Sequence, residues 1–93
     1  MKYEIIYTRR FQKSLKRVQQ LKGFKGERLK KVITVLANGE KLATEYRDHK
    51  LTGDLKDFRE CHLAPDILLI YEIDDGILTF TLVTIGSHSQ LFK

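Results

Sequence analysis

Three histidines stand in three separate polar stretches of the chain, beside other side chains that can do chemistry. His49 lies in "YRDHKL", His62 follows 13 residues later in "ECHLAPD", and His88 follows another 26 residues later in "GSHSQLF". Histidine can accept or donate a proton near neutral pH, because its unperturbed pKa is about 6.5. If folding brings the three rings together, the sequence predicts general acid-base chemistry.

Three further residues near these histidines are candidates for the same site. The carboxylate of Asp66 can accept a proton or orient a neighbouring imidazole, and Phe92 offers an aromatic face on which a ring can stack. Arg59 can pair with Glu60, with Asp57 or with a phosphate. Each candidate also has a structural interpretation, since aspartate is a common turn former and a terminal Phe can simply dock on the core.

A metal site is a second interpretation of the same residues. Three imidazoles and one carboxylate are acceptable zinc ligands, but no pair among them has the tight spacing that is typical of zinc motifs. The sequence therefore favours a site without a cofactor or metal.

The elements that must position these residues begin with one strand and two helices. The stretch "KYEIIYT" is β-prone, and Thr8 can cap the helix that follows it. Apolar residues recur at helical spacing in the first helix and again in the second, which begins near Glu27 and ends at Asn38-Gly39. The inward positions are Phe11, Leu15 and Val18 in the first helix and Leu29, Val32, Ile33 and Leu36 in the second.

The second half of the chain reads as a loop and three strands. Residues 40–55 have weak periodicity and form the loop that carries His49, whereas 57–63, 67–73 and 77–85 are predicted strands of an antiparallel meander. Side chains alternate along a strand, so Glu60 and His62 share one face of the strand 57–63 and Arg59 and Cys61 share the other. The expected fold is α+β, in the order β-α-α-β-β-β, with a helical hairpin on a mainly antiparallel four-stranded sheet.

Length and charge limit the classes of function. The 93 residues predict one domain, 1–93, and their formal net charge of +5 is unevenly distributed. Residues 1–31 contain eleven Lys or Arg and two Asp or Glu, which gives a charge of +9. Residues 32–93 contain six Lys or Arg and ten Asp or Glu, which gives a charge of −4. Such a basic segment can attract a nucleic-acid backbone or an acidic protein partner, although a solvated lysine-rich helix face looks the same.

The cellular compartment is predicted from two features. The longest apolar run, "ILLIY", is too short to span a bilayer, and the first residues lack an apolar signal region. The single cysteine, Cys61, cannot form an internal disulfide and is expected to be a small core residue. We therefore expect a cytoplasmic protein with no membrane partner.

Three sequence blocks together resemble one protein family. The run "YRDHKLTGDLKDFRECHLAPDILLIYEI" and the later "GSHSQLF" resemble the YafQ-type branch of the RelE-like bacterial toxins. That family shows Tyr-x-Asp-His-x-Leu-x-Gly, then Arg-x-x-His-x-x-Pro-Asp before an apolar strand, and a terminal Gly-Ser/Thr-His-x-x-Leu-Phe. The blocks occur here in the same order and cover about half of the chain, and the expected order of elements matches the RelE-like fold.

The resemblance implies a function, a partner and a set of site residues. It implies a ribosome-dependent mRNA endoribonuclease, the toxin of a type II toxin-antitoxin system, which a cognate acidic antitoxin neutralises, with a heterotetramer as one expected assembly. The family's catalytic residues fall on His49, His62, Asp66 and His88, and Phe92 falls on its aromatic contact to substrate. The rival functions are a non-catalytic toxin that inhibits a protein target such as DNA gyrase, and a zinc-dependent hydrolase.

Position 84 departs from the family pattern. Members commonly have an arginine two residues before the glycine of the last block, and this chain has Thr84 there. A hydroxyl can donate one hydrogen bond but cannot supply the charged, bidentate contact of a guanidinium with a phosphate. Arg59, which we expect to bind substrate, a lysine of the basic helices or the ribosome would have to supply the missing charge.

Overall fold

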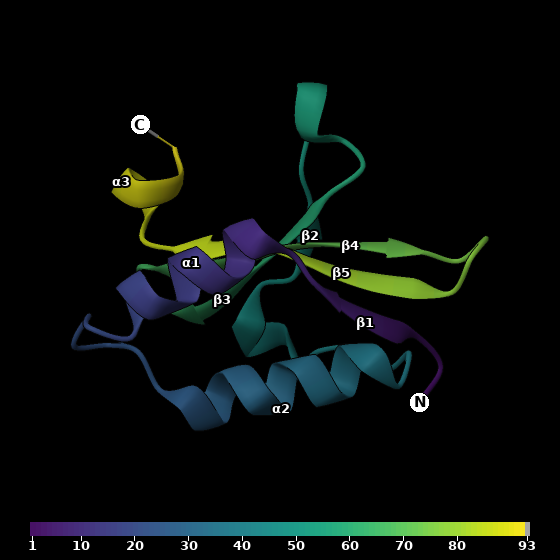
Figure 1. Ribbon diagram of the computed structural model, residues 1–93, viewed down its shortest axis with the longest axis horizontal. Coiled ribbons are helices and arrows are strands. Elements are labelled where there is room, and N and C mark those ends of the chain that lie inside the picture. The colour runs from purple at the N-terminus through teal and green to yellow at the C-terminus, as the bar shows by residue number, and fades with distance from the viewer. Residues whose placement is uncertain (93) are drawn as a thin grey trace.

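The computed structural model describes residues 1–92 as a five-stranded sheet with two helices packed on one of its faces (Figure 1). Lys93, the last residue of the expected domain, lies outside the described residues. The predicted α+β architecture is confirmed, with one strand more than the sequence indicated.

The N-terminal elements match the prediction closely. Strand β1 (Glu4–Tyr7) leads into helix α1 (Arg9–Val18), which begins where the Thr8 hydroxyl accepts a hydrogen bond from the Phe11 backbone N–H at 3.0 Å. Helix α2 (Gly26–Ala37) ends before Gly39, whose φ of +80° suits a residue without a Cβ atom.

The remaining strands form most of the sheet. They are β2 (His49–Lys50), β3 (Arg59–Ala64), β4 (Ile67–Asp74) and β5 (Thr79–Gly86), and they pair in the order β1-β5-β4-β3-β2. β1 runs parallel to β5, and every other pair is antiparallel. The expected loop around His49 is therefore wrong in part, because His49 and Lys50 extend the sheet beside β3.

Three short helices complete the description. The 3-10 turns Thr44–Tyr46 and Gly53–Leu55 flank β2, and helix α3 (His88–Leu91) follows β5 directly. The sequence predicted no element after the last strand, so α3, which begins at His88, is an addition to the predicted fold.

The two faces of the sheet have different environments. On one face, side chains such as Leu69, Tyr71 and Leu82 form the main core with Phe11 of α1 and Val32 of α2, and all five are at most 2% exposed. The other face carries the alternate residues of β3 and β4, and it is where the polar candidates gather. No helix within residues 1–92 is both long and apolar enough to cross a membrane.

Candidate active site on the open sheet face

The three histidines meet on the sheet face opposite α1 and α2. His49 comes from β2, His62 from β3 and His88 from α3, so three elements far apart in sequence supply one row of rings. The ring centroids of His49 and His62 are 6.3 Å apart, and those of His62 and His88 are 6.2 Å apart. The structure thus brings together all three histidines that the sequence singled out.

Strand register explains why they meet. Directly paired residues on neighbouring strands point to the same face. One row of paired residues crosses the strands from β2 to β5 and consists of His49, Glu60, Ile70 and Thr84. His62 begins the adjacent row, which continues through Leu68 and Gly86. α3 begins two residues after Gly86, which places His88 at the end of this second row.

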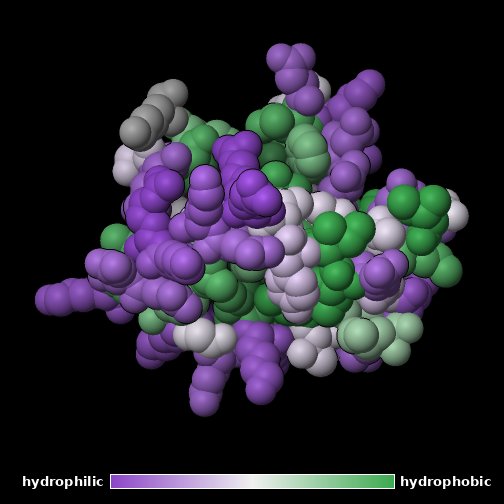
Figure 2. Space-filling model, viewed as in Figure 1, coloured by the Kyte–Doolittle hydropathy of each residue, from purple (hydrophilic) through white to green (hydrophobic). Residues whose placement is uncertain are grey.

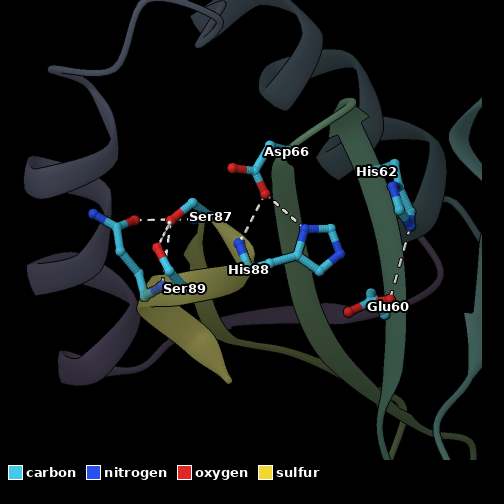
Figure 3. Close-up of polar contacts among 7 residues, drawn as sticks. Glu60, His62, Asp66, Ser87, His88 and Ser89 are labelled. Atoms are coloured by element: carbon cyan, nitrogen blue, oxygen red, sulfur yellow. Dashed lines mark hydrogen bonds and ion pairs between the residues drawn. The ribbon is translucent and has the colours of Figure 1, made fainter. Parts of the chain in front are cut away.

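Glu60 links two of the histidines. Its Oε2 lies 3.2 Å from His49 Nε2, and its side chain is only 9% exposed. The same oxygen lies 3.8 Å from His62 Nε2 (Figure 3). The Nδ1 of His49 lies 2.7 Å from the Arg47 carbonyl oxygen, to which it donates. Sequence reasoning did not count Glu60 among the site residues, although alternation had placed it on the face of His62.

Asp66 orients His88. Its Oδ1 accepts hydrogen bonds from His88 Nδ1 at 2.6 Å and from the His88 backbone N–H at 3.0 Å (Figure 3). These two hydrogen bonds hold the pKa of Asp66 below its usual value of 3.8, and the backbone contact has the larger effect. The carboxylate therefore accepts the Nδ1 proton, and Nε2 of His88 is left without a hydrogen bond from any of residues 1–92.

A capping box sets the position of His88. The Ser87 hydroxyl accepts from the Gln90 backbone N–H at 3.3 Å, and the Gln90 side-chain oxygen accepts from the Ser87 backbone N–H at 2.9 Å. This reciprocal pair starts α3 at His88. The motif is visible in the sequence as Ser-x-x-Gln.

His62 is the most enclosed of the three rings. Burial lowers the pKa of His62 below its ordinary value of 6.5, Glu60 opposes this shift, and Arg47, His49 and His88 add to it. Arg47 has a left-handed backbone, with φ of +50°, and it lines a pocket of about 270 Å³ together with His62 and Arg28. Arg47 is thus a second residue that sequence reasoning missed.

Arg59 does not join the histidines. Its Nη2 lies 2.9 Å from Asp48 Oδ2, and the other carboxylate oxygen of Asp48 accepts from the Tyr71 hydroxyl. Arg59 pairs with Tyr71 across β3 and β4, on the face that α1 and α2 cover. The expected contact of Arg59 with substrate therefore gains no support from its position, and its visible role is to hold the segment before His49 against the sheet.

Comparison with known proteins decides the family. Residues 3–93 match the family described as bacterial toxin of type II toxin-antitoxin system, YafQ. This chain belongs to the YafQ toxin family. It is 34% identical to the mRNA interferase toxin YafQ of Escherichia coli K12 over 90 residues, which covers 96% of this chain and 95% of the relative.

Two solved structures have the same fold as this YafQ-family chain. The YafQ of the E. coli DinJ-YafQ complex has a TM-score of 0.86 and 32% identity, over 98% of this chain and 99% of that one. A metal-bound toxin from Helicobacter pylori has a TM-score of 0.87 and 48% identity, over 97% of this chain and 99% of that one.

Phe92 and Cys61 occupy opposite environments in this YafQ-family fold. Phe92 follows α3 and is 45% exposed, with its backbone N–H donating to the His88 carbonyl at 2.8 Å. Its ring is therefore accessible for stacking. Cys61 is fully buried on the helix side, and burial raises the pKa of its thiol to about 12, so it has the character of a core residue rather than a nucleophile.

The lowered pKa of His62 predicts a pH dependence of stability. Unfolded His62 binds a proton more readily than folded His62, so the free energy of unfolding falls as pH drops below 6.5 and levels off below the folded pKa. We expect His62→Gln to remove this part of the pH dependence. Urea unfolding between pH 5 and 8 measures it, and identical pH profiles for the two proteins would contradict the assignment.

The Asp48 network predicts a stability effect. Asp48→Asn removes the charge that receives Arg59 and Tyr71, and we expect a loss of about 1–3 kcal/mol in the free energy of unfolding. Glu45→Gln is the matched control, because it removes only the exposed Arg28–Glu45 ion pair at 3.6 Å. That control should lose less than about 1 kcal/mol. Urea unfolding compares the two, and equal losses would show that the Asp48 network contributes little.

Proposed function

We propose that this chain is an endoribonuclease that cleaves mRNA on the ribosome by acid-base catalysis. The E. coli relative is named an mRNA interferase toxin, and one observation supports the same reaction here. That observation is the row of three imidazoles with Glu60 and Asp66 on one open face of the sheet.

The reaction needs two proton transfers and stabilisation of negative charge. The 2′-OH of the substrate attacks the adjacent phosphate after losing its proton to a base, and the departing 5′ oxygen takes a proton from an acid. Imidazole can do both, and the lowered pKa of His62 favours its neutral, proton-accepting form. His88 presents Nε2 while Asp66 holds the other nitrogen, so His88 can donate or receive a proton without losing its orientation.

His49 and Glu60 complete the proposed proton-transfer group. Glu60 Oε2 lies 3.2 Å from His49 Nε2 and 3.8 Å from His62 Nε2, so its carboxylate can accept a hydrogen bond from His49 and lies close to His62. Phe92 is proposed to stack on a substrate base, a contact worth about 1–3 kcal/mol in single-strand recognition. A ribosome-bound substrate would place this activity in the cytosol.

A metal is not used in the proposed mechanism. One relative is a metal-bound toxin, but residues 1–92 of this chain contain no group of three or more His, Cys, Asp or Glu side chains arranged to hold one metal ion. Asp66 and His88 are hydrogen-bonded to each other, and Glu60 already lies between His49 and His62. No step of the proposed mechanism is therefore assigned to a metal.

The proposed partner is an acidic antitoxin. The E. coli relative has been solved in complex with DinJ. In this chain, the excess of nine positive charges in residues 1–31 offers a docking surface for an acidic segment that folds on binding. Expression is expected to arrest growth, and co-expression of the protein encoded beside this gene should relieve the arrest.

A reconstituted translation system tests the function. Purified protein should cut a translated reporter mRNA, and the cut should persist when a chelator removes zinc and other trace metals while magnesium stays sufficient for ribosomes. Cleavage that the chelator abolishes and zinc restores would replace this mechanism with the zinc-dependent one. An intact reporter at confirmed folded concentration would reject the nuclease altogether.

A further inference from the structure

A basic cleft lies between α1 and α3, beside the end of β5. It has a volume of about 430 Å³. Its lining residues from α1 are Arg9, Arg10, Lys13, Ser14 and Arg17, and those from β5 and α3 are Thr84, Ile85, Gln90 and Leu91. Four of these nine residues are cationic and none is acidic. Figure 2 shows the hydrophilic side chains gathered over α1.

Most cations of this cleft do not stabilise their own helix; Arg17, in the last turn of α1, is the exception. Arg9, Lys13 and Arg17 are spaced four residues apart, so they form a stripe of like charge, and such pairs destabilise a helix. Arg9 and Arg10 also stand at the N-terminal end of α1, where the helix dipole disfavours positive charge. No ion pair among residues 1–92 involves any of the four cationic residues. Their arrangement therefore suits an external anion.

Two hydroxyl groups hold α1 in place beside β5. Thr8 donates to the Leu82 carbonyl at 2.7 Å, and Ser14 accepts from the Ile85 backbone N–H at 3.1 Å. Ser14 is only 7% exposed, so this second contact is well shielded from water. The basic stripe is consequently presented from a fixed position rather than from a mobile arm.

The cleft is continuous with the histidine face. Thr84 lines the cleft and also ends the row that starts at His49 and Glu60. α3 carries His88 on the side of Asp66 and carries Gln90 and Leu91 on the side of the cleft. A strand that passes the histidines can therefore continue around α3 into the cleft.

We propose that this cleft binds a backbone phosphate of the mRNA beside the one that is cleaved, and so sets the path of the strand across the histidines. This inference rests on the proposed nuclease function. Guanidinium groups bind phosphate oxygens in a bidentate manner, and cationic grooves follow single strands in this way. An acidic protein segment fits less well, because this cleft has no aromatic residue to anchor one. The other seven Lys or Arg residues of 1–31 remain for the acidic antitoxin.

Two charge-matched triple variants test the proposal. The cleft variant is Arg9→Gln, Lys13→Gln and Arg17→Gln, and the control variant is Lys16→Gln, Lys22→Gln and Lys31→Gln, three exposed lysines that do not line the cleft. Each variant removes three positive charges. Removal of the like-charge stripe should not destabilise α1, so a binding defect would not reflect unfolding.

The probe is a short single-stranded RNA with 2′-O-methyl riboses, which lacks the hydroxyl needed for cleavage. Its dissociation constant should rise about tenfold in the cleft variant. A plot of the logarithm of the binding constant against the logarithm of the salt concentration should become less steep, by about 0.7 for each phosphate that the variant no longer neutralises. The control variant should bind nearly as wild type. Replacing single phosphates with neutral methylphosphonates should weaken wild-type binding at one position and leave the cleft variant unaffected there.

Other outcomes would overturn the proposal. Equal weakening by both variants would make the cleft an ordinary part of a basic surface. A defect seen only with mRNA-free ribosomes would assign the cleft to ribosomal RNA, and one seen only with the antitoxin would assign it to that partner. In cleavage assays, the cleft variant should have a higher KM than wild type and the same rate at saturating mRNA. Oligonucleotide binding tests the cleft separately from the nuclease function, because it can be measured even if the wild-type protein does not cleave.

Discussion

Replacing His88 with glutamine is expected to lower the rate of mRNA cleavage by about 100-fold to 10,000-fold, the usual contribution of one positioned acid or base. Asp66 determines the orientation of His88, because it receives both the ring N–H and the backbone N–H of that residue, and Nε2 of His88 remains open to a substrate. The glutamine amide can still donate to Asp66 but cannot shuttle a proton. The measurement is the rate of reporter cleavage in a reconstituted translation system at matched folded concentration.

Asp66→Asn is the companion to this experiment. An asparagine retains an acceptor for the backbone N–H of His88 but loses the charge that stabilises a protonated ring, so we expect a smaller rate loss than for His88→Gln. A fully active His88→Gln protein would contradict the proposed mechanism. Growth arrest that survives His88→Gln without mRNA cleavage would favour the alternative of a toxin that inhibits a protein target, such as DNA gyrase.

Replacing Thr84 with arginine is expected to accelerate cleavage, by as much as about 100-fold, because one electrostatic donor to a transition state contributes effects of this size. The structure gives the physical reason. Thr84 ends the row that begins with His49 and Glu60, so a long cationic side chain at this position would extend over the same face as the histidines. The wild-type Thr84 is only 3% exposed and carries no charge.

The control for this change is Thr84→Gln, which adds a long side chain without the charge. Both variants must displace part of the packing between β5 and α3, so urea unfolding should be measured alongside cleavage. An acceleration by arginine and not by glutamine supports a missing phosphate contact at position 84. An unchanged or slower arginine variant would indicate that another cation, such as one from the basic cleft, already supplies the charge.

Much of the fold was predictable because it depends on local periodicity. The buried residues Phe11 and Val18 in α1, and Leu29, Val32 and Leu36 in α2, recur at the spacing of one helical face, and the hairpin forms as expected. β2 was missed because two residues are too few for any alternation to be visible. α3 was also too short for periodicity, and only its Ser87–Gln90 capping box marked it.

The sequence by itself determined which residues could do chemistry and which shared a face within one strand. Alternation correctly separated Glu60 and His62 from Arg59 and Cys61, because side chains point to opposite faces at every step of a strand. The three family blocks then indicated which of these residues form a site, and the family is confirmed.

Only the tertiary structure decided which residues meet. His49, His62 and His88 come together because β2, β3, β4 and β5 are neighbours in that order, and pairing between strands depends on long-range contacts that no local pattern encodes. The same pairing places Arg59 beside Asp48, on the other face of the sheet from the histidines. β1 pairs only with residues 79–82 of β5, and the remaining end of β5 packs against α1. This packing places the basic stripe of α1 beside α3.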